Sequence, residues 1–120
     1  MRKQRHEIYV QCPVEATLDM IGGKWKGVIL FRLTEETKRF GELRKLLPKV
    51  TQRTLTQALR ELEQDGLVQR RIYAEVPPKV EYSLTTLGRS LKPLLTRLKD
   101  WGQSNVIEGP ARKSASKPKA

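Results

Sequence analysis

The side chains that could do chemistry in this 120-residue chain gather in one segment, residues 51–66. Arg53, Gln57 and Arg60 recur at intervals of three or four residues, so a helix turning about 100° per residue would present them on one face. Guanidinium and amide groups can make paired hydrogen bonds to base edges in DNA, Arg with guanine and Gln with adenine. The pattern indicates recognition of paired bases rather than the making or breaking of bonds.

The same segment carries signals for its two ends and for a buried face. Thr51 can cap the first turn, and Gly66 can adopt the left-handed conformation that ends many helices. Leu55, Leu59 and Leu62 share the face opposite the polar one. We therefore predict a helix over residues 51–65 with one face free for DNA. An ordinary amphipathic surface helix is the alternative.

The remaining reactive groups are few. His6 is the single histidine and Cys12 the single cysteine, so we expect neither a closed metal site within one chain nor a cofactor. Gly22-Gly23-Lys24 lacks the earlier glycine and the following Ser or Thr of a phosphate-binding loop. No serine lies in a nucleophile-elbow context, and the folded part offers no histidine as its base. We predict that the protein is not an enzyme.

Cys12 stands at the start of a predicted helix, with Pro13 at the first helical position. The positive end of the helix dipole favours a thiolate there. Arg5 and His6 could assist, whereas Glu15 in the same first turn opposes. Two interpretations stay open, a small inert side chain and a redox-sensing thiol.

The composition favours a polyanionic partner. The formal net charge is +11 and the sequence pI is about 10.2, which is typical of nucleic-acid-binding domains. Solubility through charge, or binding to acidic membranes, is the alternative. The length suggests one domain, and no apolar run is long enough to span a bilayer. The basic N-terminal segment lacks the apolar stretch of a secretory signal. Because a single cysteine allows no disulfide within the chain, we expect the protein in a reducing cytoplasm.

The elements that position these groups follow from apolar spacing. We predict helices over residues 13–21, 24–33 and 40–47, the second apolar on most sides and therefore buried, with a polar loop over 34–38. Pro48 ends the third helix. A short helix, a tight turn and a helix with a polar outer face form the helix-turn-helix pattern.

A β-hairpin is predicted directly after this pair. Residues 68–74 favour strand, and residues 80–84 alternate apolar and polar side chains. Two prolines stiffen the tip over residues 75–79. Arg70, Arg71 and Lys79 make the hairpin basic, as expected if it lies along phosphates or a minor groove. An edge hairpin that uses charge to avoid aggregation is the alternative. The order indicates a winged helix, mainly α with a small β-hairpin (α+β).

Thr85 can cap a last helix that runs to about Gly102 and that Pro93 should kink or break. Its apolar face would be available for a two-fold dimer or would fold back on the core. The dimerisation residues that we predict on this face are Leu87, Leu91, Leu94, Leu98 and Trp101. Residues 1–11 are expected to be a flexible basic arm, residues 12–102 the domain, and residues 103–120 a disordered basic tail.

Several blocks of sequence, in order, resemble the HxlR-type winged helix-turn-helix transcription regulators of bacteria, relatives of the MarR group. These blocks are Cys12-Pro13-Val14, Gly22-Gly23-Lys24-Trp25, Arg39-Phe40-Gly41-Glu42-Leu43, Leu59-Arg60-Glu61-Leu62-Glu63, Asp65-Gly66-Leu67-Val68, Val80-Glu81-Tyr82-Ser83-Leu84-Thr85 and Gly88-Arg89 followed by Leu91, Pro93 and Trp101. The resemblance implies homodimers joined through terminal helices. It also implies operator binding, with the helix at 51–65 in the major groove and the hairpin at 68–84 as the wing. Several such regulators sense oxidants or electrophiles through a cysteine at the position of Cys12.

The expected partner is a double-stranded DNA operator. Two-fold symmetry predicts an inverted repeat with half-sites about one helical turn apart, and an oxidant or small molecule could act as effector. The predicted DNA-binding residues are Thr51, Gln52, Arg53, Thr54, Thr56, Gln57, Arg60, Arg71 and Lys79. The alternatives are an architectural, nucleoid-type protein with little sequence preference and a winged-helix protein-interaction module.

Overall fold

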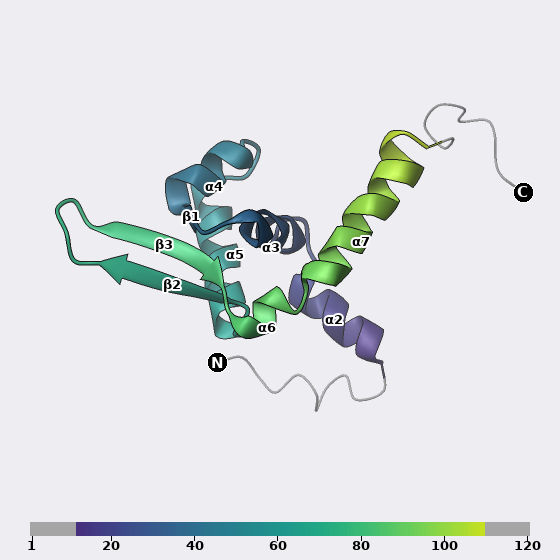
Figure 1. Ribbon diagram of the computed structural model, residues 1–120, viewed down its shortest axis with the longest axis horizontal. Helices are drawn as coiled ribbons and strands as arrows, with labels where there is room; N and C mark the ends of the chain where they lie inside the picture. The colour runs from purple at the N-terminus through teal and green to yellow at the C-terminus, as the bar shows by residue number, and fades with distance from the viewer. Residues whose placement is uncertain (1–11, 110–120) are drawn as a thin grey trace, which may run out of the picture. The chain divides into compact units, whose positions relative to one another are not determined.

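The computed structural model of the protein describes residues 12–109 (Figure 1). The predicted arm over residues 1–11, and the tail from residue 110 onward, lie outside the described residues. The described residues divide into two compact units, residues 12–90 and residues 91–109. The first unit holds the helix-turn-helix and the sheet, and the second holds the C-terminal helix.

The first two helices among the described residues are α2 (Pro13–Ile21) and α3 (Lys26–Glu35). Cys12 is the N-cap of α2, and its sulfur accepts a hydrogen bond from the backbone N–H of Glu15 at 3.3 Å. The chain then turns through Gly23, whose φ of 78° favours glycine. This turn delays the start of α3 by two residues from the predicted Lys24. The helix is central as expected, since Ile29, Leu30 and Leu33 are buried.

The helix-turn-helix consists of α4 (Phe40–Leu46) and α5 (Gln52–Gln64). Leu47 and Val50 are buried in the turn between them, so the turn is anchored to the core. Thr51 caps α5 by accepting a hydrogen bond from the backbone N–H of Thr54 at 3.0 Å. Gly66 has a φ of 79°, as expected for a residue that ends a helix. The predicted position and ends of this helix are confirmed.

The described residues form a three-stranded antiparallel sheet, one strand more than the predicted hairpin. Its strands are β1 (Lys38–Arg39), β2 (Val68–Tyr73) and β3 (Lys79–Leu84), in the order β1-β3-β2. β2 and β3 pair from Val68↔Leu84 at the base to Tyr73↔Lys79 near the tip. Figure 1 shows this hairpin extending beyond α5.

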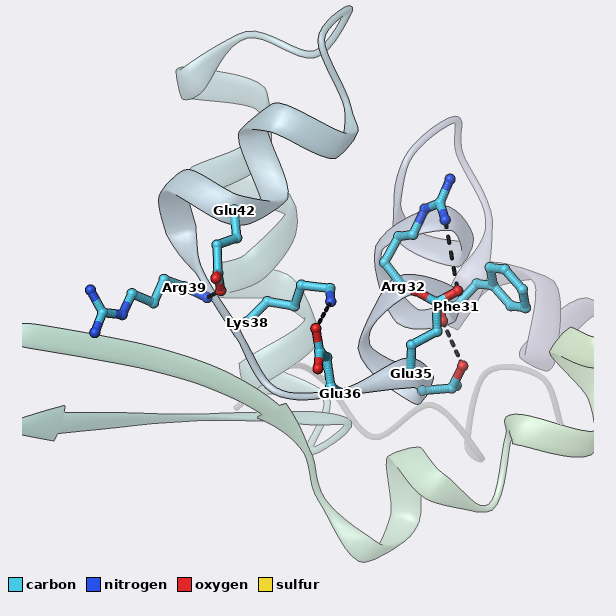
Figure 2. Close-up of polar contacts among 8 residues, drawn as sticks. Phe31, Arg32, Glu35, Glu36, Lys38, Arg39 and Glu42 are labelled. Atoms are coloured by element: carbon cyan, nitrogen blue, oxygen red, sulfur yellow. Dashed lines mark hydrogen bonds and ion pairs between the residues drawn. The ribbon is translucent and has the colours of Figure 1, made fainter.

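The predicted polar loop over residues 34–38 is wrong at both ends, because α3 runs to Glu35 and β1 begins at Lys38. A two-residue strand carries no periodicity that could be detected in the sequence. Lys38 is 7% exposed. Its ammonium group meets a carboxylate oxygen of Glu36 at 2.9 Å (Figure 2), so the aliphatic stem is buried while the charge is paired. The backbone N–H of Arg39 donates to Glu42 at 2.8 Å, which holds the first turn of α4 against the strand.

The last predicted helix is two helices, α6 (Thr86–Arg89) and α7 (Lys92–Gly102). Pro93 lies in the first turn of α7, where its missing N–H costs no helical hydrogen bond. The break therefore precedes the proline. The predicted leucine face is also divided, because Leu87 belongs to α6.

The predicted disordered tail begins too early, because residues 103–107 are helical. A π-helical turn, η1 (Gln103–Ile107), continues from α7. The side-chain amide of Asn105 donates to the carbonyl oxygen of Trp101 at 3.0 Å, and that of Gln103 donates to Glu108 at 2.6 Å. These local hydrogen bonds, which composition does not reveal, extend the helical structure beyond Gly102.

Candidate DNA-binding surface

Helix α5 has one buried face and one exposed polar face. Leu55, Leu59 and Leu62 have exposed fractions of 1% or less. On the other side Gln52, Arg53, Thr54, Gln57 and Arg60 are exposed, and Thr56 is half-buried. The leucines therefore fix the helix in the core and leave its guanidinium and amide groups accessible. This is the arrangement expected from the spacing of these residues.

The hydroxyl groups at the start of α5 are already engaged in its cap. The Thr51 hydroxyl accepts from the backbone N–H of Thr54 and donates to the Thr54 hydroxyl oxygen, both at 3.0 Å. A hydroxyl has one hydrogen to donate, so Thr51 has used its own. Thr54 keeps its hydroxyl hydrogen for an acceptor such as a phosphate oxygen.

Acidic residues near the C-terminal end of α5 are unfavourable for the helix dipole, and the structure supplies a reason for them. Glu61 meets the ammonium group of Lys26 on α3 at 2.8 Å. Glu63 meets the guanidinium group of Arg70 on β2 at 3.3 Å. These ion pairs join α5 to its neighbours on two sides and offset the negative charge beside the exposed polar face of the helix.

An open cleft of about 450 Å³ lies between the turn after α2 and the exposed face of α5. Residues 22–26 line one wall, with the Lys24 ammonium group 5.3 Å from the centre of the Trp25 ring. The other wall consists of Arg53, Thr54, Gln57, Ala58 and Glu61. Sequence reasoning missed Lys24 and Trp25 as neighbours of α5; the Gly-Gly-Lys-Trp block was their only signal.

The wing carries a cluster of basic and aromatic side chains. The Arg71 guanidinium group and the Lys79 ammonium group lie 5.0 Å and 4.6 Å from the centre of the Tyr73 ring. The Tyr73 hydroxyl donates a hydrogen bond to Glu81 at 2.8 Å, and a second oxygen of Glu81 lies 3.7 Å from the Lys79 nitrogen. Arg71 and Lys79 therefore meet at the Tyr73 ring, and Glu81 offsets part of the Lys79 charge.

Tyr73 and Glu81 are members of this cluster that sequence reasoning missed. The alternation of residues 80–84 identifies a strand but not its register, and the register places Glu81 opposite Arg71. The hydrogen bond to the Glu81 carboxylate, with a further contribution from burial, raises the pKa of Tyr73 above 10.0. Burial raises the pKa of Tyr82 in the same direction. Both phenols therefore stay neutral at physiological pH.

Cys12 is an exposed free thiol at the N-terminus of α2. Arg5 and His6, which could assist it, lie outside the described residues. Within residues 12–109 no group of three or more His, Cys, Asp or Glu side chains could hold a metal ion. No helix in that same part of the chain is long and apolar enough to cross a membrane.

Large apolar side chains are exposed on the C-terminal unit. Leu98 and Trp101 of α7 have exposed fractions of 53% and 64%, and Leu94 is also exposed. Val106 and Ile107 of η1 extend the set, whereas Leu91 is half-buried. On the first unit Leu87 of α6 is exposed. Each unit thus presents predicted dimerisation residues to its surroundings.

Comparisons with known proteins agree with this architecture. The chain is 62% identical to the HTH-type transcriptional regulator YdeP of Bacillus subtilis (strain 168) over 92 residues, which cover 77% of this chain and 72% of that protein. The redox regulator HypR in its oxidized form has a similar structure, with a TM-score of 0.76, 57% identity, and coverage of 78% of this chain and 97% of that one. Reduced YodB of B. subtilis gives a TM-score of 0.70 at 33% identity, over 82% and 97% of the two chains.

A family model covers the same region. The model of the HxlR-like helix-turn-helix matches residues 20–109, which include both helices of the helix-turn-helix, the wing and α7. This match extends past residue 102, in agreement with the helical turn observed there. The chain therefore belongs to the HxlR-like helix-turn-helix family.

Proposed function

We propose that the protein is a dimeric transcription regulator that reads an inverted-repeat DNA operator through α5. The observation that carries this proposal is the pairing of exposed Arg53, Gln57 and Arg60 with fully buried leucines on the opposite face of the helix. The names of the relatives, HTH-type transcriptional regulators, support the same class of function. Such a protein would act in the cytoplasm, where the DNA is, and would need no catalytic activity.

Affinity and specificity come from different side chains in this proposal. Lysine and arginine side chains neutralise phosphates and release counterions, which supplies affinity without sequence preference. Arg71 and Lys79 do so on the wing, and Lys24 does so from the wall of the cleft. Arg53, Gln57 and Arg60 read base edges in the major groove. Gln52 and Thr54 hold the start of the helix against the DNA phosphate backbone, whereas Thr51 serves as the helix cap. Thr56, which is half-buried, lies beside the base-reading side chains.

The exposed apolar residues of the C-terminal unit support a dimer. Leu94, Leu98 and Trp101 present a surface that a second copy of the chain would bury under two-fold symmetry. Two α5 helices related by such an axis would meet half-sites about one helical turn apart. Sedimentation of Leu98→Asp tests this step, because a charge in the interface should give a monomer with weakened operator binding.

We further propose that Cys12 makes the regulator responsive to oxidants. Two similar solved structures are of a redox regulator, and the Cys12 sulfur is exposed at a helix N-terminus. With one thiol per chain, a disulfide must join two subunits or a small thiol. Two thiols would lose two protons and two electrons to diamide, which is reduced to its hydrazine. Operator affinity after diamide treatment tests this, with Cys12→Ser as the control; unchanged wild-type affinity would contradict it.

Selection of preferred sites from random DNA tests the central proposal. We expect an inverted repeat that is bound at least about a thousandfold more tightly than random duplex at physiological salt. An architectural protein would bind random duplex nearly as well as its own promoter region. A protein-interaction module would lose DNA binding at physiological salt. Either result would reject a sequence-specific regulator.

A further inference from the structure

We infer that Glu61 is a positioning residue that sets the base preference of Gln57. The inference deepens the proposed function and rests on it, since it requires α5 to read bases. Glu61 lies one helical turn after Gln57, and both line the cleft beside Arg53. Lys26 offsets the charge of Glu61 through one carboxylate oxygen. The second oxygen is engaged by Gln57 on the exposed polar face of α5, and this contact has a consequence for base recognition.

Two successive polar contacts connect α3 to the exposed polar face of α5. The Lys26 ammonium group lies 2.8 Å from one carboxylate oxygen of Glu61. The other oxygen accepts a hydrogen bond of 3.0 Å from the side-chain amide of Gln57. The Lys26 side chain is only 14% exposed and that of Glu61 is 32% exposed. The anchor is therefore held within the fold, while Gln57 remains exposed.

The chemistry of the contact decides which way the Gln57 amide is oriented. A side-chain amide has two N–H donors at one end and a carbonyl acceptor at the other, whereas a carboxylate only accepts. Glu61 can thus bind the nitrogen of Gln57 but not its carbonyl oxygen. One N–H and the carbonyl oxygen remain available. Adenine recognition by glutamine uses one donor and one acceptor, so Glu61 orders the amide and leaves this pair free.

Lys26 allows the carboxylate to remain beside DNA. Its charge offsets that of Glu61 at close range, so the pair presents little net repulsion to phosphates. The ion pair with Lys26 also restrains the Glu61 side chain, and Glu61 in turn holds the Gln57 amide. Gln57 therefore loses less conformational entropy when it binds a base. Removal of Lys26 should therefore act in the same direction as removal of Glu61, with an added loss of affinity for every DNA sequence.

The experiment measures base preference at a single operator position. Site selection with wild type and Gln57→Ala first identifies the base pair whose preference depends on Gln57, expected to be about tenfold or more in the wild type. Dissociation constants are then measured for the preferred and the substituted operator with Glu61→Ala and Glu61→Gln. We expect Glu61→Ala to reduce the preference at that base pair to about threefold or less. Glu61→Gln has a single oxygen, which would face the Lys26 ammonium group and leave its N–H donors facing Gln57. It is therefore also expected to lose the preference.

Glu63→Ala is the matched control. It removes a carboxylate from the same helix that is also paired with a basic residue, but Glu63 contacts Arg70 rather than Gln57. Glu63→Ala should leave the preference at the Gln57 position unchanged. The readout is a ratio of two affinities of one protein preparation, so partial unfolding of a variant cancels.

Four results would overturn the inference. Glu61→Ala could keep the wild-type preference, Glu61→Gln could keep it, Glu63→Ala could reduce it as much as Glu61→Ala does, or Gln57→Ala could alter no position. Failure of the proposed function gives a different result, since the wild type itself would then show no preferred site. The two failures are therefore distinguishable in the same set of measurements.

Discussion

The hydroxyl of Thr85 donates a hydrogen bond of 2.6 Å to the carbonyl oxygen of Gly66, which joins the end of the wing to the end of α5. The backbone N–H of Thr85 donates to the carbonyl oxygen of Leu67 at 3.1 Å, and its hydroxyl accepts from the backbone N–H of Gly88 at 3.0 Å. One side chain thus connects α5, the wing and α6. The two elements that we propose to contact DNA are held together at this point.

Replacement of Thr85 by valine should destabilise the protein by about 1–2 kcal/mol. The substitution keeps the shape of the side chain but removes the cap of α6 and leaves the Gly66 carbonyl oxygen without its hydroxyl donor. Urea denaturation followed by circular dichroism measures the change. Thr86→Val, at the exposed neighbouring position, is the control and should change stability by less than about 0.5 kcal/mol. Equal effects would argue against a role for the hydroxyl.

The substitution Gly88→Ala should lower the free energy of unfolding by about 3 kcal/mol or more. A Cβ atom at this position would lie 2.1 Å from the carbonyl oxygen of Leu67, and backbone cannot move aside as a flexible side chain can. Gly41→Ala in α4 is the matched control, because a Cβ there meets nothing within 4 Å. That variant should be neutral or stabilised by about 0.5–1 kcal/mol through helix propensity. Thermal unfolding of the two variants under the same conditions distinguishes contact from propensity.

Arg53→Ala should weaken operator binding by about 1–3 kcal/mol and relax the base preference at one position. The reason is the loss of a guanidinium group that can bond two acceptors of one guanine. Fluorescence anisotropy with a panel of single-base operator variants measures the effect. A uniform loss across the whole panel would instead identify Arg53 as a phosphate contact.

The salt dependence of DNA binding should separate the two cations of the wing. Arg71→Ala is expected to reduce the slope of log K against log salt concentration by about one. Lys79→Ala should reduce it by less, because Glu81 lies 3.7 Å from the Lys79 nitrogen. Glu81→Gln should release Lys79 and increase the slope. A larger effect for Lys79→Ala than for Arg71→Ala would contradict this assignment.

The Tyr73–Glu81 hydrogen bond should persist through neutral pH and be lost in alkali. The pKa of Tyr73 is raised above 10.0 in the folded protein, so folding favours the neutral phenol. The stabilisation is fully present below the unfolded pKa and is lost as the pH rises through the folded value. Titration of tyrosinate absorbance in wild type and Tyr73→Phe isolates this group. Glu81→Gln should lower the pKa of Tyr73, and an unchanged titration would argue against the hydrogen bond as its cause.

Signals within a few residues were sufficient to predict the helices whose ends are marked by a capping residue, a glycine or a proline. Thr51 and Gly66 mark α5 because capping depends on the side chain or the backbone freedom of a single residue. Pro13 marks α2 in the same way. β1 was missed because its pairing of Lys38 with Tyr82 depends on contacts distant in sequence. The division between α6 and α7 was expected at Pro93, yet a proline fits better inside a first turn than at a break.

The candidate site was predictable on α5 and less so around it. The spacing of Arg53, Gln57 and Arg60 is a property of one helix, and their exposure agrees with it. Lys26 and Glu61 meet only because α3 packs beside α5. Side chains brought together by packing leave no mark in a linear pattern, so the ion pairs and the cleft required the structure.

The two pairings of β1, Lys38↔Tyr82 and Arg39↔Glu81, brace β3 on the side away from β2. Because β1 fixes the base of the wing, the tip of the hairpin over residues 74–78 can vary in length without displacing α5. The connection before β1 has no such freedom. One residue more or less there would exchange the inward Lys38 for an outward-facing neighbour, so homologous genes should tolerate insertions at the wing tip and reject them between Glu35 and Lys38.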